Sequence, residues 1–334
     1  VLESPGASML LGALADRGLR GRLIEVGRSG LTGAARRMRG WMRSEGIELV
    51  HSHGYRSDVL AALVSIGGPV LRMATCHTWY STTFRLRLYE WIDKLVLRLF
   101  HHAVVVSPQL YEELLRAGID RERITLIYNG VEVDGEVAGA GGLRERYGIG
   151  AESRLLLRVG RLAYDKGNST LLDAFASSFR GRDVVLLFVG EGEEHTSLQE
   201  QAARLGIGTQ VIFAGYQRNV GEFLRAADLL VISSYSEGLP LVLLEGMAFG
   251  KPIVATTAGA IGDVIEHRVE GWLVPPRDAA ALAHALEVVM DDISLAERLG
   301  SAARECYLEK HTVASMGRCY HTIYRSLLQQ VQPS

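Results

Sequence analysis

The chain alternates between short apolar runs and longer stretches in which apolar residues recur every three or four positions. The short runs are rich in β-branched residues, as is typical of buried strands, and the longer stretches are typical of amphipathic helices. This alternation predicts parallel sheets with helices on both faces. Before residue 135 the expected strands are "RLIEV", "IELVHSH", "VLRMATCH", "AVVVS" and "RITLIY". After residue 150 they are "RLLLRVG", "DVVLLFVG", "QVIFAG", "DLLVISS", "PIVAT" and "GWLVPP".

The alternation stops once, in the segment "GEVAGAGGLRERYGIG" at residues 135–150. Its density of glycine and alanine predicts a linker. We therefore expect two doubly wound α/β domains, residues 1–135 and 153–312, joined by a linker at 136–152. A chain of 334 residues is also longer than one core usually organises. Sheets of this kind bind ligands outside the carboxyl ends of their strands, so we expect a site in a cleft between the domains.

Composition and charge exclude several classes of protein. The apolar share of 48% describes a globular chain, and the net charge of −2 is too small for nucleic acid as the main partner. The three cysteines have no spacing that suggests a disulfide framework or a zinc site, which favours a reducing cytoplasm. No apolar run reaches the roughly 18 residues of a membrane-spanning helix, and no export signal opens the chain.

One apolar stretch, "SYSEGLPLVLLEGMAFGKP" at 234–252, contains two acids. It follows an expected strand and begins a helix, whose N-terminus suits a phosphate. Glu237 lies in the turn, where it can reach a hydroxyl-rich group. Glu245 lies on the second helical turn among apolar residues, where a carboxylate needs a hydrogen-bond donor such as a ribose diol. The alternative, in which both acids are simply solvated, is weaker for Glu245 than for Glu237.

A second motif, "VGRLAYDKG" at 159–167, also follows an expected strand. Arg161 and Lys166 lie close together on its glycine-bounded turn and could hold a diphosphate. Taken alone, two cations on a loop are usually solvated. The presence of two phosphate-suited features at strand ends favours a binding role.

Three histidines follow strands in the first half of the chain. His53 and His77 are expected to face the cleft, where they could donate to a phosphate or exchange a proton with a hydroxyl. His51 is expected to be structural. The histidines and carboxylates show no metal-ligand spacing, so we expect no metal.

Two basic amphipathic stretches, residues 34–43 and 84–100, allow two interpretations. Cationic helices with Trp and Leu can lie on an anionic membrane surface. An ordinary solvated helix face with long arginine side chains is an equally good interpretation.

The motifs together resemble those of the retaining glycosyltransferases of family 4. "EGLPLVLLEGMAFGKPIVAT" resembles the family's motif of two glutamates separated by seven residues, and "VGRLAYDKG" resembles its diphosphate loop. "VVVSPQLYEELLRAGIDRERITLIYNGVEVD" and "VEGWLVPPRDAAALAHAL" resemble two further segments. The resemblance runs from about Gly21 onward. It implies the GT-B fold: two Rossmann-like domains face each other across a cleft, and a C-terminal helix at 313–334 packs on the first domain.

The resemblance also implies roles for individual residues. The second domain would bind the nucleotide sugar, and the first would bind most of the acceptor. Arg161 and Lys166 would bind the diphosphate, Glu237 the transferred sugar and Glu245 the ribose. The implied donor-binding residues are Gly160, Arg161, Lys166, Gly215, Tyr216, Glu237, Gly238, Leu239 and Glu245. The implied catalytic residues are His77, Arg161, Lys166 and Glu237, and the implied acceptor-side residues are His53 and Trp79.

The implied reaction breaks the bond between the anomeric carbon and the diphosphate. Arg161, Lys166 and the helix N-terminus would stabilise the leaving group. Retention by front-face attack needs no protein nucleophile, so Glu237 would position the sugar. No cofactor or metal is expected beyond the nucleotide-diphosphate sugar, which is the donor substrate. The expected acceptor is a hydroxyl of a glycan or a lipid-linked glycan precursor, and the oligomeric state is not indicated.

The chain departs from the family pattern at two places. It opens with "VLESPGASMLLGALADRG", in which Pro5-Gly6 is the single turn, where the family has a strand and a glycine-rich loop. Thr78, Trp79 and Tyr80 follow His77 where the family often has glycine. Two alternatives therefore stay open: a sugar-nucleotide epimerase of the same architecture, and a non-catalytic nucleotide-binding protein.

Overall fold

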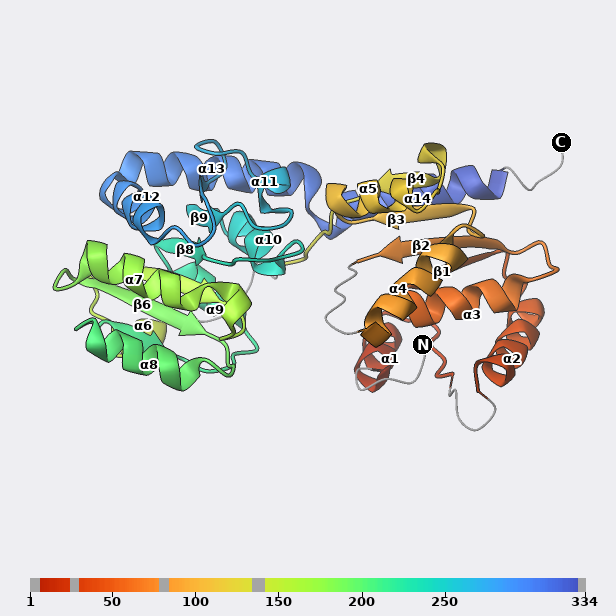
Figure 1. The fold of residues 1–334 in the computed structure, drawn as a ribbon, viewed down its shortest axis with the longest axis horizontal. Coiled ribbons are helices and arrows are strands. Elements are labelled where there is room, and N and C mark those ends of the chain that lie inside the picture. Colours follow the sequence, from red (N-terminus) through yellow and green to blue (C-terminus); the bar gives the residue numbers. More distant parts are fainter. Residues whose placement is uncertain (1–6, 25–29, 78–83, 134–141, 330–334) are drawn as a thin grey trace. The chain divides into compact units, whose positions relative to one another are not determined.

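The computed structural model describes residues 7–24, 30–77, 84–133 and 142–329. The chain forms two compact units, which Figure 1 shows as two groups of strands and helices. Unit 1 comprises residues 1–127 and 319–334, and unit 2 comprises residues 128–318. Each unit is built on a parallel sheet, as the alternation of apolar patterns predicted.

Unit 1 contains a four-stranded parallel sheet in the order β1-β2-β3-β4. Its strands are β1 (Leu49–His53), β2 (Leu71–Cys76), β3 (His102–Val105) and β4 (Ile124–Leu126). Its helices are α1 (Ala7–Asp16), α2 (Gly30–Ser44), α3 (Tyr55–Ser65), α4 (Phe84–Leu97), α5 (Pro108–Arg116) and η1 (Arg121–Arg123). Four of the five expected strands are therefore present. Of the expected strand "RLIEV", the described part ends at Ile24, which is buried in the core.

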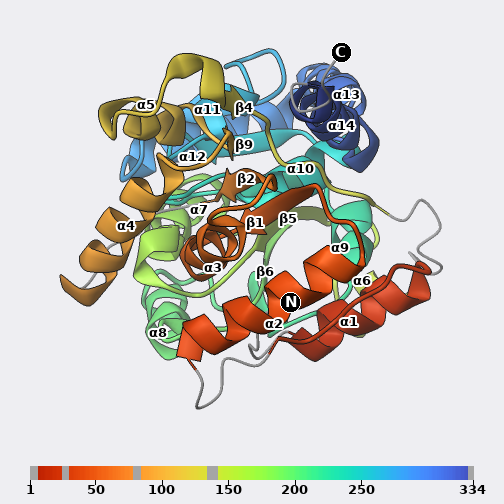
Figure 2. The ribbon, with the colours of Figure 1, turned by 90° about the vertical axis from the view of Figure 1, so that its right-hand side faces the viewer.

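The two faces of this sheet have different partners because side chains alternate along a strand. Val50, Ala74 and Cys76 belong to the core that includes α2 and α3, and these two helices pack on each other in Figures 1 and 2. His51 and Thr75 instead contact Tyr320 and Tyr324, which lie on the C-terminal helix.

Unit 2 contains a six-stranded parallel sheet in the order β10-β9-β8-β5-β6-β7. Its strands are β5 (Arg154–Val159), β6 (Val184–Val189), β7 (Val211–Phe213), β8 (Leu229–Ile232), β9 (Ile253–Thr256) and β10 (Trp272–Val274). Its helices are α6 (Leu143–Arg146), η2 (Tyr164–Lys166), α7 (Asn168–Phe179), α8 (His195–Arg204), α9 (Val220–Ala226), α10 (Leu241–Ala248), α11 (Ile261–Val264), α12 (Ala279–Asp291) and α13 (Ile293–Lys310). The final helix, α14 (Val313–Gln329), continues from unit 2 into unit 1. All six expected strands are present.

Helices cover both faces of the unit 2 sheet, which explains its continuous apolar strands. One core cluster lies beneath α7, α8 and α12, and the other beneath α9, α10 and the second half of α13. The strands β8 and β9 are buried along their whole length for this reason. The strand order reverses between β5 and β8, so the connections of these two neighbours run to opposite sides of the sheet.

The unit boundaries differ from the expected domain boundaries of 135 and 312. Unit 2 begins at residue 128 because the backbone N–H of Val131 donates to the His311 carbonyl at 3.0 Å, and its carbonyl accepts from the Tyr307 hydroxyl. Part of the expected linker at 136–152 is also folded, since Leu143 and Ile149 are buried in the unit 2 core. The first six residues of α14, 313–318, lie beyond the expected domain end and stay with unit 2 as well.

Candidate functional site

A pocket of about 230 Å³ lies in unit 2, where the strand order reverses. It is lined by residues from the end of β5, the following loop, the end of β8 and the first turn of α10. Lys166, Ser234 and Glu237 contribute its polar groups together with Arg158. Ligands of doubly wound sheets bind at such a reversal because adjacent connections diverge there and leave a crevice.

Lys166 and Glu237 form an ion pair in this pocket. Lys166 Nζ lies 2.7 Å from Glu237 Oε1 and 3.3 Å from Asp165 Oδ2. The Ser234 hydroxyl donates to the same Glu237 Oε1 at 2.7 Å. The side chains of Lys166 and Glu237 are only 16% and 13% exposed, so each charge depends on the other for compensation. The sequence predicted both residues in the site but gave no indication that they pair.

The loop that carries Lys166 is pressed against the end of β8. A Cβ atom on Gly167 would lie 2.0 Å from the Ser233 carbonyl oxygen, and its φ of 63° is in the left-handed region. The Ser233 hydroxyl donates to the Lys166 carbonyl at 3.0 Å, and the Tyr235 N–H donates to the Asp165 carbonyl at 2.8 Å. Only glycine at position 167 allows this approach.

The turn that carries Glu237 is held from its other side. A Cβ atom on Gly259 would lie 2.0 Å from the Glu237 carbonyl oxygen. The Ala260 N–H donates to the Gly238 carbonyl at 2.9 Å. Gly238 and the half-buried Leu239 therefore belong to a fixed turn directly before α10.

The remaining donor-binding candidates differ in their surroundings. The Arg161 side chain is 67% exposed, with Nη2 at 3.5 Å from Asp165 Oδ1. Glu245 is half-buried, and burial raises the pKa of its carboxyl group. Within the described chain, no hydrogen bond or ion pair involves the Glu245 carboxylate. Its oxygens are therefore available to a ligand, although Glu245 does not line the 230 Å³ pocket itself.

Gly215 and Tyr216 follow β7, at the edge of the sheet. The Gly215 carbonyl accepts from the Gly190 N–H at 2.8 Å, and the Tyr216 N–H donates to Glu191 Oε1 at 3.3 Å. The Tyr216 side chain is 71% exposed. These contacts fix the backbone beyond β7 and leave the tyrosine ring open to solvent.

In unit 1, His51 has the surroundings of a structural residue. Its Nδ1 lies 2.6 Å from the Tyr324 hydroxyl and its Nε2 lies 2.7 Å from the Thr75 hydroxyl. Burial, together with the charges of the neighbouring His53 and His77, lowers the pKa of His51 to about 3. His51 is therefore neutral near pH 7 and joins α14 to the sheet.

His53 and His77 lie side by side at the ends of β1 and β2. His53 Nδ1 is 3.0 Å from His77 Nε2, so one ring donates to the other. Partial burial lowers the pKa of both imidazoles, and the charge of His77 lowers that of His53 further. His53 also lines a pocket of about 550 Å³ in unit 1, whose other walls include Ile24, Met38 and Leu60. Trp79, the other acceptor-side candidate, lies outside the described residues.

Two features near the unit 2 pocket were missed from the sequence. Arg158 lies within β5 and is buried. Its sequence signal was a single cation inside the apolar run "LLLRVG". Arg277 Nη1 donates to the Tyr164 hydroxyl at 2.8 Å, and its guanidinium carbon lies 4.1 Å from the Tyr235 ring centroid. This stack braces the loop of Lys166. It had no local sequence signal, because its three residues come from different loops.

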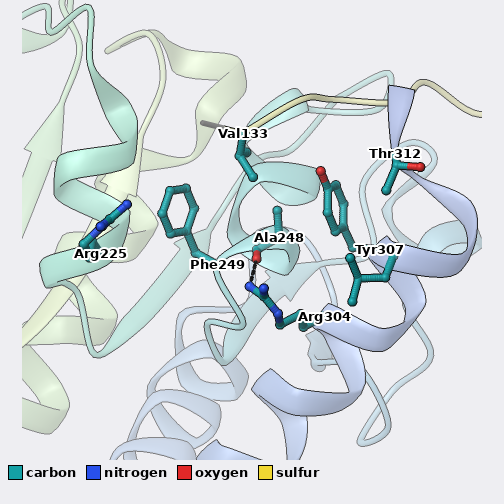
Figure 3. Close-up of a pocket in the computed structure, with 8 residues that line it drawn as sticks. Val133, Arg225, Ala248, Phe249, Arg304, Tyr307 and Thr312 are labelled. Atoms are coloured by element: carbon teal, nitrogen blue, oxygen red, sulfur yellow. Dashed lines mark hydrogen bonds between the residues drawn. The ribbon is translucent and has the colours of Figure 1, made fainter. Parts of the chain in front are cut away.

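A second pocket in unit 2, of about 470 Å³, lies near the C-terminal ends of α9 and α10 (Figure 3). Its cations are engaged by the protein: Arg304 Nη1 donates to the Ala248 carbonyl, and the Arg225 guanidinium lies 5.6 Å from the Phe249 ring centroid. This pocket lies at the C-terminal end of α10, whereas the pocket of Lys166 and Glu237 lies at the first turn of the same helix.

Metal ligands and membrane-spanning helices were also sought among the described residues. No group of three or more His, Cys, Asp or Glu side chains there is arranged to hold a metal ion. None of the helices in the described ranges combines the length and the apolar character needed to cross a membrane.

Two family models match the chain. Residues 142–306 match "Glycosyl transferases group 1", and residues 13–134 match "Glycosyltransferase Family 4". Among curated relatives, the N-acetyl-alpha-D-glucosaminyl L-malate synthase of Bacillus anthracis is 33% identical over 187 residues, which are 56% of this chain and 49% of that protein. The chain thus spans about half the length of this relative.

Solved structures with similar folds cover nearly the whole chain. Anabaena Alr3699/HepE in complex with UDP has a TM-score of 0.84 and 21% identity, covering 95% of this chain and 89% of that one. A glycosyltransferase from Rickettsia africae has a TM-score of 0.82 and 19% identity, covering 98% and 97%. These likenesses show the GT-B fold.

The contacts of His51 predict a pH-dependent stability. Its pKa is about 3 when folded and near 6.5 when unfolded, so below pH 6.5 the unfolded chain binds a proton that the folded chain does not. Stability should therefore fall as the pH falls, by up to about 2 kcal/mol from this residue between pH 7 and pH 5. Urea unfolding of His51→Gln should show a weaker pH dependence than the unmodified chain. His321→Gln, at an exposed histidine, serves as the control, and equal slopes in all three proteins would contradict the assignment.

Proposed function

We propose that this chain, which belongs to the glycosyl transferases group 1 family, transfers a sugar from a nucleotide-diphosphate sugar to an acceptor hydroxyl with retention of configuration. The observation that carries the proposal is the ion pair of Lys166 and Glu237 in the pocket at the strand-order reversal. It combines a cation for a phosphate with an acid for sugar hydroxyls at the edge where such sheets bind ligands. The Anabaena protein of the same fold is described in complex with UDP, so uridine nucleotides are the first ligands to try.

In this proposal the donor diphosphate competes with Glu237 for Lys166. Arg161 is exposed, and its side chain could turn from Asp165 toward the same phosphates. The first N–H groups of α10 lie at the same edge. As the sugar–phosphate bond breaks, negative charge grows on the leaving diphosphate. These groups stabilise that charge, which is the main requirement of the reaction.

Glu237 then accepts hydrogen bonds from the transferred sugar. Both of its hydrogen bonds within the described chain fall on Oε1, so Oε2 is available to sugar hydroxyls. Glu245 would accept from the ribose with its unengaged carboxylate. His77 would donate to the donor sugar or phosphate, and His53 would contribute to the acceptor side. The front-face path uses the leaving phosphate as the base, so it needs no protein nucleophile or metal.

The proposed function is tested with a panel of UDP-, GDP- and ADP-sugars. One nucleoside diphosphate is expected to raise the melting temperature, and its sugar is expected to be hydrolysed slowly and transferred to glycan or lipid-linked acceptors. NMR should show the donor's anomeric configuration in the product. An isomerised donor formed without acceptor would instead indicate an epimerase, and nucleotide binding without release of sugar would indicate a non-catalytic protein.

Lys166→Ala should weaken nucleoside-diphosphate binding by about 10- to 100-fold. Charge-assisted hydrogen bonds contribute roughly 1.5–3 kcal/mol, and Glu237 would remain as an unpaired negative charge facing the phosphates. Isothermal titration calorimetry measures the affinity. Lys310→Ala, which removes an exposed lysine on α13, is the matched control. Unchanged affinity of Lys166→Ala would remove the diphosphate assignment.

Glu237→Gln should separate binding from turnover. Loss of the negative charge frees Lys166, so the affinity for the nucleoside diphosphate should stay constant or increase. Turnover should fall by at least about 10-fold, because the neutral amide forms weaker hydrogen bonds to the sugar in the transition state than the carboxylate does. Glu309→Gln on the helix surface is the control. A parallel loss of affinity and turnover would argue against contact between Glu237 and the sugar.

Contact with a membrane is also proposed, for α4 rather than α2. Leu88, Trp91 and Leu95 recur on one face of α4 and are 45%, 60% and 37% exposed. In α2, by contrast, Arg39 is engaged, since its guanidinium donates to the carbonyls of Leu63 and Val64. Trp91→Ser should reduce cosedimentation with vesicles that contain phosphatidylglycerol. Leu308→Ser, at a residue of similar exposure in unit 2, should leave it unchanged, and equal sedimentation of both variants would contradict this contact.

A further inference from the structure

Arg158 is the more deeply buried of the two cations, Arg158 and Lys166, that line the 230 Å³ pocket of unit 2. It lies near the carboxyl end of β5, and its residue exposure is 2%. Its Nε and Nη1 atoms are buried and have no hydrogen-bond partner in the structure. Buried guanidinium groups are normally paired because an isolated charge loses its hydration without compensation. The groups that should satisfy Arg158 are therefore missing from the described chain.

The backbone makes room for this guanidinium at Gly160, which also lines the pocket. A Cβ atom at Gly160 would lie 2.5 Å from Arg158 Nη1, and Gly160 has a φ of 137°. Any residue other than glycine would both strain the backbone and displace the arginine. The side chain of Arg158 thus lies against Gly160, immediately beyond the strand, where the pocket begins.

The charges around Arg158 distinguish it from Lys166. Burial outweighs the nearby charges of Glu237, Asp165 and Glu194 and lowers the pKa of Arg158 to about 10, so the guanidinium stays protonated at neutral pH. Lys166 has direct ion pairs with Glu237 and Asp165, whereas no carboxylate of the described chain lies within 4.0 Å of the Arg158 nitrogens. Without a ligand, Lys166 is compensated at short range and Arg158 is not.

We infer that Arg158 is a further anion-binding residue of this pocket beside Lys166, and that its guanidinium donates to an oxyanion of the bound ligand. The planar guanidinium presents two parallel N–H groups that match a phosphate or a carboxylate. Two sources of the oxyanion are compatible with the pocket: a phosphate oxygen of the donor diphosphate, and the carboxylate of an acidic donor sugar. The naming of the ligand as a nucleotide sugar rests on the proposed function, whereas the binding of an anion does not.

The test compares Arg158→Met with the unmodified protein by calorimetry. The probes are inorganic pyrophosphate, a nucleoside monophosphate, the matching diphosphate, and its hexose and hexuronate conjugates. Arg154→Met is the matched control, because it removes an arginine from the amino end of the same strand. Melting temperatures establish that each variant is folded. Arg158→Lys, which keeps the charge but loses the planar fork, serves if Arg158→Met does not fold.

A contact with phosphate predicts at least tenfold weaker binding of pyrophosphate and diphosphate to Arg158→Met, with the monophosphate much less affected. A contact with an acidic sugar predicts a tenfold loss for the hexuronate conjugate alone. Arg158→Lys should show the same preference with a smaller loss. Unchanged affinity of a folded variant for every probe would overturn the inference.

The outcomes for Arg158 and for the proposed function are separable. Pyrophosphate binding that depends on Arg158, in a protein that transfers no sugar, would leave the inference standing and remove the proposed function. If Arg158→Met transfers sugar with the rate and affinity of the unmodified protein, the proposed function stands and the inference about Arg158 is overturned.

Discussion

The ion pair of Lys166 and Glu237 connects the loops that follow β5 and β8, the two strands at which the order of the unit 2 sheet reverses. Since the two connections diverge there, they leave a crevice, and the loops after β5 and β8 line the pocket together with the first turn of α10. The pair forms because Gly167 lets one loop approach the Ser233 carbonyl and Gly259 lets another chain segment approach Glu237 from behind. The positions of both charges therefore depend on Gly167 and Gly259, where the neighbouring backbone leaves no room for a side chain.

Because of this ion pair, Lys166 is not an uncompensated positive charge in the pocket. Arg161 and Lys166 look in the sequence like two cations for a diphosphate, but Lys166 is already compensated by Glu237 and Asp165. In the proposed function, a phosphate that binds Lys166 would share this cation with the two carboxylates, and Glu237 Oε2, which has no partner among the described residues, would be available to the sugar. Under the proposed function, the ion pair of Lys166 and Glu237 would therefore couple phosphate binding to the positioning of the sugar. Arg158, which has no carboxylate of the described chain within 4.0 Å, would offer its charge to a ligand without such sharing.

The strands and both site motifs could be predicted from the sequence because their signals are local. Apolar β-branched runs mark the strands, and glycine-bounded turns with charges mark the loops after β5 and β8. The pairing of β5 with β8 has no local signal, so the contact between Lys166 and Glu237 could not be predicted. The same reason applies to Leu143 on α6 and to Ile149 beyond it: their segment looked like a linker, although both residues are buried in the core. It also applies to Tyr324, whose contact with His51 spans 273 positions.

The two histidines of unit 1 impose a further constraint on proton positions. His53 Nδ1 and His77 Nε2 share one hydrogen bond, and both rings have a lowered pKa that favours the neutral form. If His53 donates, His77 must carry its proton on Nδ1 after accepting at Nε2, and His53 Nε2 is left as an acceptor. If His77 donates, the two outer nitrogens exchange these roles. The pair thus always presents one donor and one acceptor, and they switch together. A phosphate or sugar oxygen that accepts from His77 Nδ1 therefore fixes His53 Nε2 as an acceptor for a hydroxyl hydrogen.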